Sequence, residues 1–296
     1  MSVMSSHNIL AHSLMARDLL ALTKPKITIM ALLVAAGGLL HARPQQSLWP
    51  ALFSLVGIAF LVSGSSALNM YLEREHDQKM TRTRTRPLPA GRLNARWAVF
   101  IGILCTISSS FILWQSTNVL TLVAGLTSLV LYVWCYTPLK QYSWTALLVG
   151  SVPGAMPVML GYIAITGVID KKALALFLWA FLWQIPHFLA ISLFRESEYT
   201  KAGFPVLSRV IGRDLTKCSI LLTSWLLVFS TFVLYWADVF GNFLCIGALT
   251  VGGWFLLLCH QGYKTMDTDI WARRAFKGSL IYQTILFVLI IISAFV

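Results

Sequence analysis

Long apolar stretches alternate with short polar segments along almost the whole chain. Each stretch is close to the roughly 20 residues that an α-helix needs to cross the apolar part of a bilayer. The pattern therefore predicts an all-α polytopic membrane bundle, with a polar N-terminal segment at 1–24 and a single transmembrane domain at 25–296. The nine apolar stretches lie at about 26–42, 48–72, 96–114, 118–138, 143–165, 172–194, 217–237, 239–263 and 276–296.

Composition agrees with this prediction. Of the 296 residues 57% are hydrophobic and 11% are charged, whereas soluble domains carry about 25% charged residues. The five cysteines are scattered and form no C-x-x-C pair, which argues against a zinc site or a disulfide framework. We expect them to be small buried hydrophobic residues.

The positive charges are distributed very unevenly. Twenty of the 23 lysines and arginines fall in the N-terminal segment or in the loops after spans 2, 4, 6 and 8. The other loops hold three, at Arg43, Lys171 and Lys172. This asymmetry predicts a cytoplasmic N-terminus and a C-terminus on the opposite side. The net charge of +12 is thus a topology signal, with anionic lipid or diphosphate as partners and no nucleic acid.

One dense polar stretch, residues 69–91, follows the second apolar span. Asn69, Glu73 and Asp77 are spaced by four, which places them on one face of an α-helix, each about 6 Å beyond the last. Carboxylates at this spacing repel each other unless a cation lies between them. Amide and carboxylate oxygens with phosphate oxygens suit Mg²⁺.

Arginines follow this acidic face directly, at Arg82, Arg84 and Arg86. The guanidinium group binds phosphate through paired hydrogen bonds. Acids for a metal followed by arginines for an anion predict a Mg²⁺–diphosphate site. The alternative is a solvated positive loop whose acids cap a helix.

Three further segments carry candidate chemistry. Tyr136 and Lys140 are the first and last residues of the phrase Tyr-Thr-Pro-Leu-Lys, which follows the fourth span. Lys140 could equally be a positive residue that only fixes the membrane topology. The sixth span contains Trp183, Gln184 and His187. Such polar groups are costly in lipid unless paired or functional, and a lone His is more often a hydrogen-bonded structural group. The loop after that span carries Glu198, Tyr199 and Lys201.

These motifs resemble the heme O synthase branch of the UbiA-type intramembrane prenyltransferases. The resemblance rests on the Asn and two acids at intervals of four, on Met-Thr-Arg-Thr-Arg-Thr-Arg-Pro-Leu at 80–88, and on Trp-Gln-Ile-Pro-His-Phe at 183–188. An acid-Tyr pair followed by Ala-Gly-Phe-Pro, at 198–205, resembles the second acidic motif. Glu73 and Glu198 stand where Asp is commoner, and Ala146 stands where the family pattern has Asn.

The resemblance implies nine helices around a central cavity open to the cytoplasmic side. It also implies that farnesyl diphosphate donates its C15 chain to a vinyl group of protoheme IX (heme B), and that water adds to give heme O. In this reading heme B is a substrate, and the cofactor is Mg²⁺, bound by Asn69, Glu73, Asp77 and Glu198.

The remaining candidate residues receive roles from the same resemblance. Catalytic roles fall to the Mg²⁺ ligands together with Lys140 and Tyr199, with Arg82, Arg86, Lys140 and Lys201 neutralising the diphosphate. Substrate binding involves Tyr136, Trp183, Gln184 and His187, and His187 would contact either the heme iron or a propionate.

Three alternatives remain open. A UbiA-type enzyme with another aromatic acceptor would share the metal site, although the Trp-Gln-x-Pro-His phrase disfavours it. A catalytically silent heme-binding assembly factor is suggested by Glu73, Ala146 and Glu198. A transporter would concentrate polar groups at mid-membrane, whereas here they gather at one side. For the preferred reading we expect a bacterial inner-membrane protein that works beside heme A synthase or oxidase assembly proteins.

Overall fold

The computed structural model describes residues 14–42, 48–263 and 267–295, and every regular element in these ranges is helical. Within them, eight helices are long and apolar enough to cross a membrane, and a ninth span results if the bent pair Leu14–Leu22 and α2 (Pro25–His41) is one span. The predicted all-α membrane bundle is therefore confirmed. The other long elements are α3 (Leu48–Gln78), α4 (Ala95–Ser116), α5 (Val119–Val130), α7 (Ala146–Thr166), α8 (Lys171–Phe194), α11 (Arg213–Trp236), α12 (Asn242–His260) and α13 (Thr268–Ser293).

Helix α13 begins earlier than the apolar pattern predicts. The Asp267 side chain accepts hydrogen bonds from the backbone amides of Asp269 and Ile270, at 2.9 and 3.0 Å, and so caps the helix. Arg273 and Arg274 consequently lie inside a helix, one turn before the apolar part starts. The apolar pattern does not reveal this part of the helix, because its residues are helical but polar.

The cysteine expectation is correct for three residues and wrong for two. Cys105, Cys245 and Cys259 are buried, but Cys135 is exposed and Cys218 is half-buried. All five are free thiols. An apolar helix face can lie either inside the bundle or on its outer surface against lipid. Hydropathy alone therefore does not tell a buried cysteine from a lipid-facing one.

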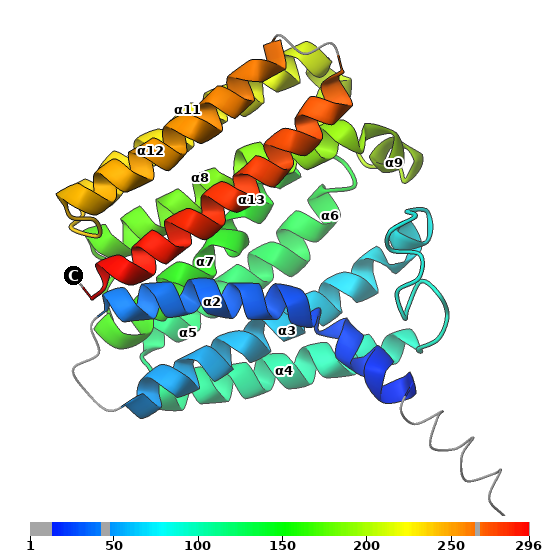
Figure 1. The fold of residues 1–296 in the computed structure, drawn as a ribbon. Helices are drawn as coiled ribbons and strands as arrows, with labels where there is room; N and C mark the ends of the chain where they lie inside the picture. Colours follow the sequence, from blue (N-terminus) through cyan, green and yellow to red (C-terminus); the bar gives the residue numbers. More distant parts are fainter. Residues whose placement is uncertain (1–13, 43–47, 264–266, 296) are drawn as a thin grey trace, which may run out of the picture.

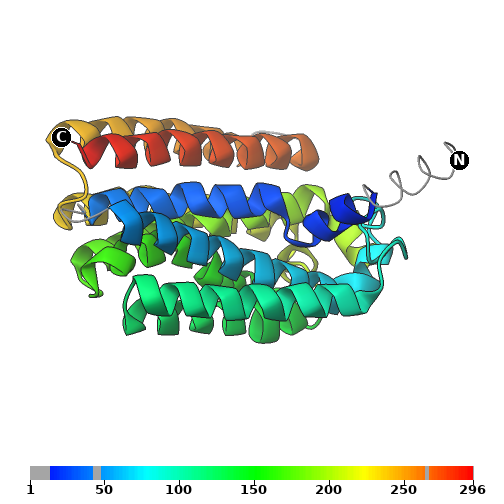
Figure 2. The same ribbon diagram turned by 90° about the horizontal axis from the view of Figure 1, so that it is seen from below.

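Helices α7 and α8 form the centre of the bundle, and α2, α11 and α13 pack on them. Figure 2 shows α2 lying along the inner helices, while α12 and α13 form an outer pair. Close approach of α2 and α7 depends on glycine. A Cβ atom on Gly161 would lie 1.9 Å from the Ala35 carbonyl oxygen, and one on Gly38 would lie 1.9 Å from that of Val158.

The polar connections predicted to face the cytoplasm gather at one end of the bundle. Helix α3 ends there, and the loop 79–94, α6 (Thr137–Leu139) and α9 (Glu196–Lys201) lie at the same end, on the right in Figure 1. Short α10 (Leu207–Ile211) connects α9 to α11. The candidate residues of the two acidic motifs therefore meet at one end of the molecule.

Candidate active site

The acidic face predicted on α3 exists and is buried. Asn69, Glu73 and Asp77 are 1%, 5% and 3% exposed, all on the last turns of α3. Buried carboxylates need compensation by a cation or hydrogen bonds. Arg86 supplies this for Asp77, with Nη1 donating to Oδ2 at 2.7 Å.

Glu73 is paired with Lys140 from the other side of the site. Lys140 Nζ donates to Glu73 Oε1 at 3.1 Å and lies 4.6 Å from the centre of the Phe204 ring. Burial by itself would lower the pKa of Lys140, but the Glu73 carboxylate outweighs that effect and raises the pKa above its ordinary value. Lys140 is therefore positively charged at neutral pH while it is paired with Glu73.

A stretch of π-helix, η1 (Leu131–Tyr136), brings Lys140 and its neighbours to α3. Such a wide turn leaves carbonyl groups without their usual α-helical partners, and Thr137 Oγ1 donates to the Tyr132 carbonyl at 2.8 Å. The same hydroxyl accepts from Asn69 Nδ2 at 2.9 Å. The ring of Tyr136 stacks on that of Tyr132 at 5.4 Å.

Lys24 completes the cation set, although it is not among the site residues predicted from the sequence. Its Nζ donates to Asn69 Oδ1 at 2.7 Å. The backbone at Lys24 has φ 46° and ψ 63°, the left-handed conformation, which residues other than Gly rarely adopt. The bend between Leu14–Leu22 and α2 is at this residue. Strain of this kind accumulates at functional sites.

Helix α9 brings the second acidic motif against the arginine run. Glu198 Oε1 accepts from the Arg82 backbone amide at 3.3 Å, and Oε2 accepts from Arg195 Nη1 at 2.9 Å. Burial favours the neutral carboxyl, yet the bonds from Arg195 and Arg82 lower the pKa of Glu198 below its ordinary value. Arg82 Nη2 also donates to Tyr199 Oη at 3.4 Å.

A cleft of about 400 Å³ opens between the loop 79–94 and α9. Four of its lining residues are cationic and one is acidic, so it would attract an anion. Lys201, predicted to bind diphosphate, lines this cleft. The lining residues are Lys79, Thr81, Arg82, Arg195, Ser197, Glu198 and Lys201.

The carboxylates of the site do not surround a common point. Within the described ranges no group of three or more His, Cys, Asp or Glu side chains is arranged to hold a metal ion. Glu73, Asp77 and Glu198 are instead bonded to Lys140, Arg86 and Arg195. Their oxygens still fit Mg²⁺ chemically, because each is an oxygen ligand held by a side-chain cation that can be exchanged.

The polar residues of α8 lie apart from this acidic face and are bonded elsewhere. Gln184 Nε2 donates to the Ser151 and Ala180 carbonyls, both at 3.0 Å. Its side chain fills the space opposite Gly154, where a Cβ would come within 2.0 Å of Oε1.

Trp183 and His187 both bond to Ser279 of α13. Trp183 Nε1 donates to the Ser279 carbonyl, and His187 Nδ1 pairs with the Ser279 hydroxyl, each at 2.8 Å. The His187 ring also lies 4.7 Å from the rings of Trp183 and Phe276. These contacts satisfy one ring nitrogen of His187, as the structural alternative requires, and leave its role with heme a prediction.

Two signals could have identified Lys24 and Thr137 earlier. Lys24 lies in the Leu-Thr-Lys-Pro phrase that precedes the first span, and Thr137 lies in the Tyr-Thr-Pro-Leu-Lys phrase. Ser279 has no comparable signal, because it belongs to none of the motifs that the sequence shows.

Comparison with known proteins identifies the family of this chain. The sequence model of the UbiA prenyltransferase family matches residues 29–281. The chain belongs to the UbiA prenyltransferase family. Relatives within the family include the protoheme IX farnesyltransferase of Myxococcus xanthus, 40% identical over 92% of each chain. That of Sorangium cellulosum is 42% identical over 81% of this chain and 86% of its own length.

Solved UbiA structures share the fold. A digeranylgeranylglyceryl phosphate synthase superposes with a TM-score of 0.80 over 94% of this chain and 98% of its own, at 17% identity. A UbiA homologue from Archaeoglobus fulgidus, bound to DMAPP and Mg²⁺, gives 0.69 over 94% and 99%, at 16% identity. The UbiA helical arrangement is thus present in this chain, and the protein is an integral membrane prenyltransferase.

Proposed function

We propose that this protein transfers the farnesyl group of farnesyl diphosphate to a vinyl group of protoheme IX, and that addition of water gives heme O. The observation that carries the proposal is 40% identity over 92% of the chain to a protein named protoheme IX farnesyltransferase. Relatives at 33–42% identity from several bacteria carry the same name.

The buried end of α3 would bind the diphosphate. Asn69, Glu73 and Asp77, with Glu198 from α9, would hold Mg²⁺, which when bound neutralises charge on the leaving diphosphate. A UbiA homologue of the same fold is bound to DMAPP and Mg²⁺, which supports this assignment.

The cations now paired with these carboxylates would then change partners. Lys140 and Arg86 bond to Glu73 and Asp77 in the structure. Once released from the acids, the two cations would be free to donate to the diphosphate oxygens, where they would stabilise the negative charge that develops as the C1–O bond breaks. Arg82 and Lys201 would supply further positive charge from the loop 79–94 and α9.

The aromatic and apolar side chains around the site would exclude water from the allylic cation until its C1 atom bonds to the vinyl group. Tyr136 and Tyr199 lie beside Lys140 and Arg82 and would line the passage of the donor. Trp183, Gln184 and His187 would contact the porphyrin. Water then adds to the cation formed on the porphyrin side chain and loses a proton, which yields the hydroxyethyl group of heme O.

The remaining assignments belong to the same proposal. Residues 25–296 would form one transmembrane domain after the segment 1–24, with the N-terminus and the site on the cytoplasmic side of a bacterial inner membrane. Heme O leaves the enzyme as a lipid-soluble product, so heme A synthase or oxidase assembly proteins would be its acceptors.

The test is a product assay with purified protein in lipid nanodiscs. Protoheme IX, farnesyl diphosphate and Mg²⁺ are supplied. The porphyrins are then separated by chromatography, and their masses are measured by mass spectrometry. We expect a heme heavier by one farnesyl group and one hydroxyl group. Heme binding without conversion would favour a silent assembly factor, and conversion of a quinone precursor but not of heme would favour another acceptor.

A further inference from the structure

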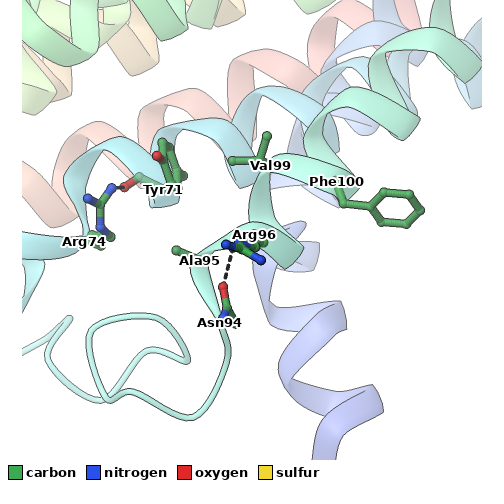
Figure 3. A pocket seen from close by; sticks show the side chains of 7 residues that line it. All are labelled: Tyr71, Arg74, Asn94, Ala95, Arg96, Val99 and Phe100. Atoms are coloured by element: carbon green, nitrogen blue, oxygen red, sulfur yellow. Dashed lines mark hydrogen bonds between the residues drawn. The ribbon is translucent and has the colours of Figure 1, made fainter.

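A second cleft lies outside the site, on the flank of the bundle where α3 ends and α4 begins. Its volume is about 490 Å³, and no carboxylate is among its seven lining residues. Figure 3 shows Arg74 from α3 and Arg96 from α4 among the lining side chains, with the Phe100 ring pointing away from the others. The lining residues are Tyr71, Arg74, Asn94, Ala95, Arg96, Val99 and Phe100.

Arg74 is held in position for an anion. Its Nη1 donates to the Tyr71 carbonyl at 2.8 Å, and its guanidinium lies 4.6 Å from the centre of the Tyr71 ring. Its one acidic partner among the residues that the structure describes is Glu75, at 3.1 Å. The Glu75 side chain is 75% exposed, so water screens its charge strongly and the pair is weak.

Arg96 has no acidic partner among the described residues, and its side chain is exposed. It lies at the second residue of α4. The Asn94 side chain accepts from the Arg96 backbone amide at 2.9 Å and so fixes this first turn. The positive end of a helix dipole adds to the charge of the arginine. The cleft is therefore positive on both sides.

An exposed apolar stripe continues from the cleft along α4. Phe100, Ile103, Ile107 and Phe111 are 56%, 50%, 62% and 64% exposed, and their intervals of three and four place them on one helix face. From Phe100 to Phe111 the rise is about 17 Å at about 1.5 Å per residue. One leaflet of a bilayer has an apolar thickness of about 15 Å, half of about 30 Å.

We infer that this cleft binds the phosphate of an anionic phospholipid, whose acyl chains lie along the apolar stripe of α4. The negative phosphate would lie at the level of the positive Arg74 and Arg96 side chains. The apolar stripe is about as long as one leaflet is deep, which matches the length of the acyl chains. Arginine-rich pockets between membrane helices select acidic headgroups in this way. The exposed ring of Trp97, in the same turn as Arg96, suits the headgroup level.

The test is native mass spectrometry of the full chain, offered phosphatidylglycerol or phosphatidylcholine with identical acyl chains. We expect preferential retention of phosphatidylglycerol. Exchange of both cleft arginines, R74Q/R96Q, lowers its affinity roughly 10- to 30-fold, at about three- to fivefold per arginine. The matched control R274Q/K277Q removes two exposed cations from α13 and leaves the affinity unchanged.

Two further measurements test whether the ligand is a lipid or free phosphate, and whether a loss of binding comes from the site or from misfolding. Inorganic phosphate in millimolar excess does not displace the lipid, because the apolar stripe contributes to binding. Phe100→Ser, which leaves both arginines in place, weakens retention as well. Equal retention of the two lipids, undiminished retention by R74Q/R96Q in a folded variant, or displacement by phosphate alone would each overturn the inference.

Discussion

Removing one partner of the buried Glu73–Lys140 ion pair leaves the other charge uncompensated inside the protein. The two side chains are 6% and 19% exposed, and Nζ lies 3.1 Å from Oε1. At this distance an effective dielectric constant of about 20 gives an attraction of about 5 kcal/mol. Breaking a buried pair from one side costs about 3–5 kcal/mol.

We expect Lys140→Gln to approach that cost, since Glu73 then keeps its charge with Lys24 as a more distant cation. Glu73→Gln should cost less, because Lys140 retains the Phe204 ring at 4.6 Å. In the double variant neither charge remains, so its loss of stability should be smaller than the sum of the single losses by about 1–3 kcal/mol. Lys171→Gln is the control. Its pair with Asp238 is exposed, so water screens the attraction and its removal should leave stability nearly unchanged.

The measurement is a double-mutant cycle of unfolding in mixed micelles, with farnesyl diphosphate binding titrated on the same four proteins. If Lys140 turns to the diphosphate as proposed, the double variant regains stability but not affinity. Additive losses would show that the two groups do not form a buried pair. Recovery of both stability and affinity in the double variant would refute the role of Lys140 in binding.

Asp77→Ala should abolish heme O formation in isolated membranes while the protein still fractionates with the membrane, because it removes a buried carboxylate of the proposed metal site; full activity would contradict this. His187→Ala should weaken heme binding and leave farnesyl diphosphate binding nearly intact. Ser279→Ala, which removes only the hydrogen-bond partner of His187, should instead lower the free energy of unfolding by about 1–3 kcal/mol. A parallel fall of both affinities with a lowered melt in His187→Ala would indicate a purely structural histidine. The raised pKa of Lys140 means that its stabilisation is complete below its unfolded-state pKa of 10.5 and is lost only as pH rises through the higher folded value. The difference in melting temperature between wild type and Lys140→Gln should therefore stay constant from about pH 6 to about pH 7, and a difference that shrinks over this range would contradict the pairing.

Local pattern predicts the helices and the acidic face, because both depend on residues close in the chain. Asn69, Glu73 and Asp77 lie on one face by spacing alone, and the structure buries that face. Their partners depend on tertiary contacts that no local pattern contains. Lys140 is 67 positions from Glu73, and Lys24 is 45 positions from Asn69.

Two local geometries also escaped prediction. The left-handed backbone at Lys24 is one that sequence rules reserve for Gly or Asn, so nothing marked Lys24 as the residue at the bend. The π-helix at 131–136 inserts an extra residue in the turn, which sets the direction of Thr137 and Lys140. His187 was expected at the acceptor, and its bond to Ser279, 92 positions away, could not be read from an apolar span.

The most direct test of the Mg²⁺–diphosphate site is a titration of farnesyl diphosphate with and without Mg²⁺, on wild type, Asp77→Asn and Arg274→Gln. Wild type and the Arg274→Gln control should bind at least about tenfold more tightly with Mg²⁺. Asp77→Asn should lose that gain while a thermal melt shows that it remains folded. An Asp77→Asn protein whose affinity responds to Mg²⁺ as wild type does would contradict the assignment of the buried α3 face as the metal site.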